Sequence, residues 1–351
     1  MKVCFVLPKS QMEIVGGYKI VYEYANRLTE HGIDVMIMHL NSRSLKRYHI
    51  PTVMRRAIMD TIMRIEPRWF PLSKEVKKIS DFSEKSLELV NQCDAVVATA
   101  VSTASFVNKL PETVKKCYFI QGFENWSVSE SELYKTYGYG MRNYVVSNWL
   151  KSIVDAHSEK ESILLSNPID DRVYREVTPY SLREGNSVGV LYNPNECKGF
   201  DYALKAIVRL KELFPDLTVK VFGSFSRPKS LPKWIQYKKK ASQQETVALY
   251  NSVRVFLCAS IDEGFGLTGY EAMACGCVLV TSNFQGAMEY VCDGENALVS
   301  ERKDVEAMVR NVSKVFADDK LAICLSENGK KTVSQTTWDS TISKFLLSLK
   351  E

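Results

Sequence analysis

Two glutamates eight positions apart, Glu263 and Glu271, lie in the stretch that says most about possible chemistry, "SIDEGFGLTGYEAMACG". The apolar run before it, "RVFLCA", predicts a buried strand, and the residues from Thr268 onward predict a helix. A turn between such a strand and helix leaves backbone N–H groups at the positive end of the helix dipole, which favours an anion such as a nucleotide diphosphate. Gly264 and Gly266 would let the backbone approach that anion closely.

Each carboxylate also has a purely structural interpretation. Thr268-x-x-Glu271 fits a capping box, in which Glu271 would only satisfy a backbone N–H at the helix start. Glu263, next to a glycine, fits a solvated turn residue. The two glutamates follow the same strand, however, and this pairing favours a ligand. We expect Glu263 to accept hydrogen bonds from sugar hydroxyls and Glu271 to accept them from ribose hydroxyls.

Three other loops carry candidate groups. Lys198, in "LYNPNECKGF", follows an apolar run, and its ammonium could neutralise a diphosphate leaving group. Gly16 and Gly17 follow the first predicted strand and could pass close to a phosphate, although the dinucleotide pattern G-x-G-x-x-G is absent. Gln121 and Glu124, in "CYFIQGFENW", follow another strand and are candidates for sugar or acceptor contact. Each of these loops also fits an ordinary surface connection.

The loops that carry these groups connect short apolar strands to amphipathic helices, which alternate along the chain. This alternation predicts parallel sheets covered by helices. The chain has 351 residues, enough for two domains. We therefore expect an α/β protein with two Rossmann-like domains facing across a cleft, where ligands bind beyond the carboxyl ends of the strands. The predicted strands are 3–7, 35–39, 95–98, 117–120 and 144–146 in the first half, and 188–191, 219–222, 255–259, 278–281 and 297–299 in the second. Helices are predicted at 16–31, 202–213 and 246–251.

Composition narrows the function class. The sequence is 45% hydrophobic and 25% charged, as in ordinary globular enzymes. No apolar run is long enough for a transmembrane helix, and the first residues do not form a secretory signal. The nine cysteines lack the spacing of a metal site, and Cys275 and Cys277, which flank Gly276, fit a structural role. We expect reduced thiols, a cytoplasmic location and no metal.

Basic residues gather in one segment. Ten Lys/Arg face three Asp/Glu between Arg43 and Lys78, so this segment carries +7 while the other residues together carry −2. The cations alternate with aliphatic and aromatic residues, which indicates a basic amphipathic surface for anionic lipid headgroups or lipid-linked diphosphate acceptors, on the inner face of the plasma membrane. A partly buried helix pair with solvated cations is the alternative. The acidic remainder argues against nucleic acid as a partner.

The motifs, taken in order, resemble the retaining glycosyltransferases of family 4 (glycosyl transferases group 1), which have the GT-B architecture. "GGYKIVYEYANRLTEHGIDV" is similar to their first glycine loop and helix, and "SNPID" to their hinge element. "CKGFDYALKAI", the E-x7-E pair in "EGFGLTGYEAMACG", and "TSNFQGAMEYVCDGENALVS" are similar to their later motifs. The resemblance implies an N-terminal domain at 1–167, a donor domain at 168–334, and a C-terminal helix at 335–351 that packs back on the first domain.

The resemblance also implies roles for individual residues. The implied catalytic group comprises Glu263, Lys198 and Gln121. The implied donor site comprises Gly16, Gly17, Asn193, Gly223, Tyr237, Lys238, Gly264, Phe265, Gly266, Leu267, Thr268 and Glu271. The implied acceptor contacts are Glu124, Arg55 and Arg56. The family usually has an arginine where this sequence has Asn193, so one positive charge on the diphosphate is missing here. It also usually has a histidine in the loop that holds Gln121 and a proline after Cys277.

The sequence thus predicts a retaining, metal-independent, hexosyltransferase-type enzyme that moves a sugar from a nucleotide-diphosphate donor to a glycan or lipid-linked acceptor in cell-surface polysaccharide or glycan synthesis. It needs no cofactor. Two alternatives remain: a non-catalytic GT-B subunit that binds and stabilises a partner transferase, and a GT-B sugar-nucleotide epimerase.

Overall fold

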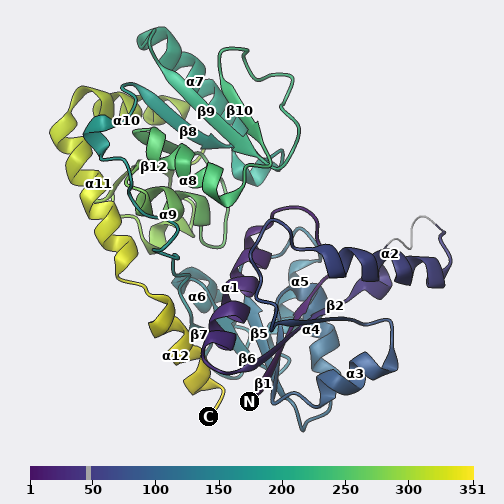
Figure 1. The fold of residues 1–351 in the computed structure, drawn as a ribbon. Coiled ribbons are helices and arrows are strands. Elements are labelled where there is room, and N and C mark those ends of the chain that lie inside the picture. Colours follow the sequence, from purple (N-terminus) through teal and green to yellow (C-terminus); the bar gives the residue numbers. More distant parts are fainter. Residues whose placement is uncertain (45–48) are drawn as a thin grey trace. The chain divides into compact units, whose positions relative to one another are not determined.

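The computed structural model describes residues 1–44 and 49–351, and the chain divides into two compact units (Figure 1). Unit 1 comprises Met1–Ser166 and Asp339–Glu351, and unit 2 comprises Asn167–Trp338. Each unit is built on a parallel sheet connected through helices, so the predicted α/β class is confirmed. Within the described ranges, no helix is both long and apolar enough to cross a membrane. Lys46 and Arg47 of the basic segment lie outside the described residues.

Unit 1 contains a seven-stranded sheet of order β3-β2-β1-β4-β5-β6-β7, with every pair parallel. Its elements are β1 (Lys2–Leu7), α1 (Gly16–Glu30), β2 (Asp34–His39), η1 (Asn41–Arg43), α2 (Thr52–Ile65), β3 (Lys77–Ser80), α3 (Glu84–Asn91), β4 (Ala95–Ala98), α4 (Val101–Asn108), β5 (Lys115–Ile120), α5 (Glu130–Tyr137), β6 (Arg142–Val145), α6 (Asn148–Asp155), β7 (Ile163–Leu164) and all but the first residue of α12 (Trp338–Ser348).

Helix α1 follows the sequence pattern closely. The four residues of its predicted apolar stripe, Val21, Tyr24, Ala25 and Leu28, are all buried. Gly32 has φ of +73°, the left-handed conformation of a residue just past a helix end, so the predicted stop is confirmed.

The end of the chain adds to the same core. The ring of Phe345 in α12 lies 5.1 Å from that of Tyr144 in β6 and 6.3 Å from that of Phe5 in β1, between ring centroids. The hydroxyls of Ser348 and Tyr144 lie 2.8 Å apart. Helix α12 therefore completes the hydrophobic core of unit 1.

Unit 2 contains a six-stranded parallel sheet of order β10-β9-β8-β11-β12-β13. Its elements are η3 (Tyr180–Leu182), β8 (Ser187–Leu191), η4 (Glu196–Lys198), α7 (Phe200–Leu213), β9 (Thr218–Gly223), β10 (Gln236–Lys239), α8 (Gln243–Ser252), β11 (Val255–Cys258), α9 (Leu267–Ala274), β12 (Val278–Ser282), η5 (Ala287–Glu289), β13 (Ala297–Ser300), α10 (Val305–Ala317) and α11 (Asp319–Ser334). The aliphatic faces of β8, β9, β11 and β12 pack against α7 and α10 to form the core.

Every predicted strand is present, and the strands of the described residues that were not predicted, β3, β7 and β10, all lie at sheet edges. In β10, "QYKK", three of the four side chains are exposed, so there is no apolar run to detect. Strand β3 lies inside the basic segment, where it follows α2. In its described residues, 43–44 and 49–78, the segment comprises the end of η1, the helix α2 and the start of the edge strand β3, so the alternative of a helix pair is wrong there.

Candidate functional site

The loop between β8 and α7 holds Lys198 in a fixed position. The backbone N–H of Asn195 donates to Asn193 Oδ1 at 2.9 Å, and that of Cys197 donates to Asn195 Oδ1 at 3.2 Å, so two successive turns shape the loop. Gly199 ends it with φ of +61°, and a Cβ at this position would lie 1.8 Å from the carbonyl oxygen of Ala259. The loop is thus pressed against the end of β11.

The loop between β11 and α9 is tied directly to the first. The backbone N–H groups of Ile261 and Asp262 both donate to the carbonyl oxygen of Cys197, at 2.7 and 3.2 Å. Gly286 supports the loop from the other side, where a Cβ would lie 2.5 Å from the carbonyl oxygen of Glu263. Because backbone contacts join the two loops, the side chains of Lys198 and Glu263 are brought together.

Lys198 and Glu263 form an ion pair of 2.6 Å between Nζ and Oε2. Ser260 Oγ donates to the other carboxylate oxygen, Oε1, at 2.5 Å. Burial alone would lower the pKa of Lys198, but the Glu263 carboxylate outweighs burial, so the pKa of the ammonium is raised above its usual range. The pair therefore holds a charged ammonium and a carboxylate side by side, and a ligand anion would bind the ammonium while ligand hydroxyls donate to the carboxylate.

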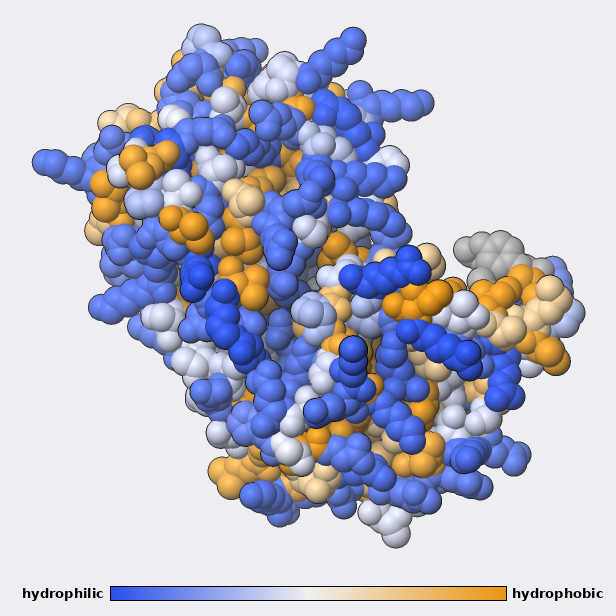
Figure 2. Space-filling model, viewed as in Figure 1, coloured by the Kyte–Doolittle hydropathy of each residue, from blue (hydrophilic) through white to orange (hydrophobic). Residues whose placement is uncertain are grey.

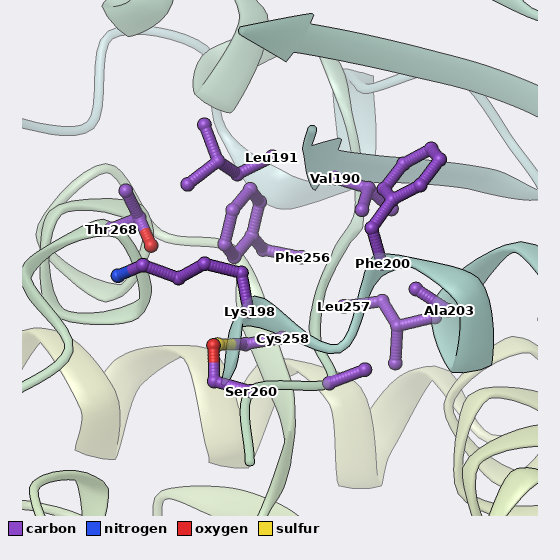
Figure 3. A pocket seen from close by; sticks show the side chains of 11 residues that line it. Val190, Leu191, Lys198, Phe200, Ala203, Phe256, Leu257, Cys258, Ser260 and Thr268 are labelled. Carbon is purple, nitrogen blue, oxygen red and sulfur yellow. The ribbon is translucent and has the colours of Figure 1, made fainter. Parts of the chain in front are cut away.

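Figure 3 shows the pocket beside this pair, where the Lys198 ammonium points toward Thr268 at the start of α9. Apolar side chains of β8, α7 and β11 form much of the lining, and Lys198, Ser260 and Thr268 supply its polar groups. A polar rim on an apolar wall is typical of small-molecule sites.

Helix α9 begins before the residue that the capping-box interpretation requires as its N-cap. Its N-cap is Gly266, with φ of +88° and no side-chain cap bond, and Thr268 is already the second helical residue. The capping box of Thr268 and Glu271 is therefore wrong. Instead Glu271 is 6% exposed, and the hydroxyl of Tyr250 in α8 donates to its Oε2 at 3.2 Å.

The other predicted donor residues of unit 2 surround this centre. The ring of Phe265 packs on those of Tyr270 and Tyr290, with centroids 5.2 Å away in both cases, so only its backbone faces the loop. Leu267 is the first residue of α9, and Gly264 precedes Phe265 in the loop.

Gly223, Tyr237 and Lys238 lie at the β9–β10 edge. Gly223 ends β9, where a Cβ would lie 2.3 Å from the carbonyl oxygen of Tyr192. The Tyr237 hydroxyl donates to the carbonyl oxygen of Phe225 at 2.7 Å, and Lys238 pairs with Glu245 at 2.5 Å. This edge is joined to the Lys198 loop through the ring of Tyr192, which lies 6.1 Å from that of Tyr237.

In unit 1, the structure brings three predicted residues together at the start of α1. Gly16 and Gly17 are the first helical residues, and no side chain caps them. Gln121 Nε2, from the loop after β5, donates to the Gly17 carbonyl oxygen at 3.2 Å.

Glu124, in the same loop as Gln121, turns to another helix. Its Oε2 accepts the N–H of Val101, the first residue of α4, at 3.1 Å. Burial raises the pKa of Glu124 to about 7, although the bond from Val101 partly opposes the shift. This carboxyl can therefore exchange a proton near neutral pH.

The two arginines predicted as acceptor contacts have different surroundings. Arg55 donates to the carbonyl oxygens of Ser42 and Ser44, at 3.0 and 3.4 Å, so it links α2 to the η1 segment. Arg56 pairs with Asp60 at 3.6 Å on an exposed face, with 53% of its side chain accessible. Their contact with an acceptor stays a prediction.

Sequence reasoning missed Ser260 and Tyr250. Ser260 had a signal, since it immediately follows the apolar run and precedes Glu263 by three residues. Tyr250 had none, because it comes from α8, 21 residues before Glu271, and only the packing of α8 beside α9 brings the two side chains together.

The residues of unit 2 that hold this site match a known protein family. Residues 187–332 match the family model described as glycosyl transferases group 1. Unit 2 carries a glycosyl transferases group 1 domain. This group 1 domain contains Lys198, Glu263 and Glu271, together with both loops that hold them.

Curated relatives agree with the family. The chain is 31% identical over 112 residues to the capsular polysaccharide biosynthesis glycosyltransferase CapM of Staphylococcus aureus, a match that covers 30% of each chain. It is 23% identical over 175 residues to a D-inositol 3-phosphate glycosyltransferase of Corynebacterium urealyticum, covering 45% of this chain and 41% of the relative. The chain therefore matches less than half the length of these two relatives.

Solved structures extend the likeness to both units. A TarM variant from S. aureus aligns with a TM-score of 0.78 and 9% identity, covering 100% of both chains. HepE of Anabaena, solved with UDP and glucose, aligns with a TM-score of 0.76 and 14% identity, covering 99% of this chain and 98% of that one. At these identities the likeness shows the fold alone, and that fold is GT-B.

Proposed function

We propose that this chain is a glycosyltransferase that moves a sugar from a nucleotide-diphosphate donor to a glycan or lipid-linked saccharide acceptor. The observation that carries the proposal is the Lys198–Glu263 ion pair beside the start of α9, inside a group 1 domain. The relatives include CapM and an O-antigen chain mannosyltransferase of Escherichia coli, which supports a role in cell-surface polysaccharide or glycan synthesis.

The donor would lie over the first turn of α9. Its pyrophosphate would accept backbone N–H groups at the positive end of the helix dipole, and Lys198 would neutralise its charge. Glu263, held by Lys198 and Ser260, would accept hydroxyls of the donor sugar, while Glu271, held by Tyr250, would accept those of the ribose.

Transfer would proceed on one face with retention of configuration. The acceptor oxygen bonds to the anomeric carbon as the bond from that carbon to the phosphate oxygen breaks, and the acceptor proton passes to the leaving diphosphate. Glu263 is engaged on both oxygens, which suits hydroxyl binding better than attack on the anomeric carbon. Lys198 would supply the positive charge that a metal supplies elsewhere, so we expect no metal requirement.

A thermal-shift screen against UDP, GDP, dTDP and their sugars tests donor binding, because a ligand that binds only the folded state raises Tm. UDP is the first candidate, since TarM and HepE were solved with it. Nucleotide release is then measured with and without acceptor, and with EDTA, and the anomeric configuration of the product is read by NMR. No shift with any nucleotide would contradict the proposal, and an inverted product would contradict its mechanism.

A non-catalytic GT-B subunit is the second candidate, and Asn193 favours it. Where the family usually has a cation, Asn193 turns its Oδ1 to its own loop. Nucleotide binding without turnover, in the presence of acceptor mixtures, would favour this subunit over the enzyme.

A further inference from the structure

Helix α2 has two apolar faces, and the fold uses only one of them. Met59 is buried, and Ile62 and Met63 are half-buried on the same side, where α2 packs against β3 and η1. The opposite side carries four large aliphatic residues in water. These are Val53 (80% exposed), Met54 (56%), Ile58 (38%) and Ile65 (44%).

The four exposed residues form one continuous stripe. At 100° per residue they span an arc of roughly 140°, and Ala57 and Thr61, both exposed, fall within it. Figure 2 shows orange side chains gathered on the surface where Figure 1 places α2. Four aliphatic side chains held in water along one helix face exceed the scattered exposure of an ordinary surface, so this face marks an interaction.

The charges around the stripe indicate the kind of partner. Seven Lys/Arg face three Asp/Glu from His49 to Lys78. On the same 100° spacing, the exposed Arg64 falls inside the arc beside Val53, and the exposed Arg56 falls about 60° beyond Val53, where it pairs with Asp60 at 3.6 Å. Other cations of the segment are used by the fold: Lys78 Nζ donates to the carbonyl oxygen of Glu66 at 2.6 Å, and Arg55 donates to η1. Arg64 has its side chain in water, and Arg56 keeps 53% of its side chain accessible beside Asp60, so both side chains can reach an anionic partner.

We propose that α2 binds the surface of an anionic lipid bilayer, with the stripe in the boundary between headgroups and acyl chains and Arg56 and Arg64 on lipid phosphates. A helix with exposed aliphatic residues and exposed arginines on or near the same face has the two features that interfacial binding requires, apolar area and positive charge. A bilayer offers both complements at once, over a surface that needs no matching groove. This proposal does not depend on the donor chemistry of unit 2.

Sedimentation with vesicles tests the proposal, using phosphatidylcholine alone and a 7:3 mixture of phosphatidylcholine and phosphatidylglycerol. We expect the full chain to partition at least tenfold more strongly into the anionic vesicles, with the preference falling at high salt. Arg56→Gln/Arg64→Gln should weaken binding to anionic vesicles about 25-fold, at about fivefold per arginine. Met54→Ser/Ile58→Ser should weaken it about tenfold and keep the salt dependence.

Two substitutions in unit 2 serve as matched controls. Arg209→Gln removes an arginine of 52% exposure that is also paired with a glutamate, and Leu213→Ser removes an aliphatic residue of 60% exposure. Both should bind vesicles as the parent does, and all variants should keep the parent Tm. Equal binding to both vesicles, or equal losses in the control variants, would overturn the proposal. The proposal would also fail if the parent did not bind vesicles but formed a dimer that Met54→Ser/Ile58→Ser dissociates. In that case α2 would bind a second copy of the chain.

Discussion

The two units share a parallel sheet and differ in how their strand-end loops are built. In unit 2, the loops after β8 and β11 are joined by backbone hydrogen bonds, fixed by the close approach of Gly199, and end on a short ion pair. In unit 1, the corresponding loop after β5 carries Trp126, which is 72% exposed, and Gln121 of this loop contacts α1 through its side-chain amide. Unit 2 is thus preorganised for a small charged ligand, whereas the loop of unit 1 leaves a large aromatic side chain in water.

The largest effect should come from removing the charges of unit 2. Lys198→Ala and Glu263→Ala should each lower kcat by about 10²- to 10³-fold, because each removes a preorganised group beside the reacting diphosphate. The double variant should lose little more than the worse single variant, since each side chain holds the other. Steady-state transfer rates measure both effects.

Glu196→Gln is the control, because this exposed acid lies on the same loop, whereas the carboxylate that pairs with Lys198 is that of Glu263. It should keep the parent rate. Full activity in Glu263→Ala would remove the ion pair from the mechanism.

The stability of unit 2 should also depend on the close approach of its two loops. Gly199→Ala should destabilise the protein by about 3 kcal/mol, because the new Cβ meets the Ala259 carbonyl in a left-handed backbone conformation. Gly32→Ala, in unit 1, has a similar φ of +73° with nothing within 4 Å of the added Cβ, and should cost only about 1 kcal/mol. Urea unfolding of both variants gives the difference, and equal losses would show that the clash is relieved by movement of the loop.

This contrast also explains what the sequence could predict. Buried strands and the E-x7-E pair were visible because apolar runs and local spacing report them directly. Glu271 also fits a capping box in the sequence, because the left-handed Gly266 that caps α9 two residues before Thr268 has no side chain to signal it. Tyr250 could not be found at all, since its contact with Glu271 depends on how two helices pack. Strand β10 escaped detection because an edge strand with exposed side chains has no apolar pattern.

In unit 1, Glu124 predicts a pH effect on stability. Its pKa, raised by burial to about 7, exceeds that of the unfolded chain, near 4.5, so the folded state holds its proton longer. Stability should fall as pH rises from about 4.5 to about 7, by about 3 kcal/mol in total, and then level off. Glu124→Gln keeps an acceptor for the Val101 N–H and should remove this dependence.

Urea unfolding at pH 5 and pH 8 measures the Glu124 effect as a difference between parent and variant. The variant should gain stability relative to the parent at pH 8 and match it closely at pH 5. An identical pH dependence in both proteins would place the Glu124 carboxylate in water.

The smallest effect concerns the support of Glu271. Tyr250→Phe removes one hydroxyl bond to the carboxylate, worth about 1 kcal/mol, and should weaken nucleotide binding about fivefold with kcat nearly unchanged. Calorimetric Kd values for the nucleotide, compared with kcat, test this division. A fall in kcat at unchanged Kd would assign Glu271 to the sugar rather than to the ribose.

The central claim is that the donor pyrophosphate binds at the start of α9. A crystal structure with the nucleoside diphosphate that gives the largest thermal shift tests it most directly. We predict phosphate oxygens within hydrogen-bond distance of Lys198 Nζ and of the first backbone N–H groups of α9, and a ribose hydroxyl on Glu271. A nucleotide bound elsewhere, with Lys198 still paired to Glu263 and no phosphate beside it, would contradict the account.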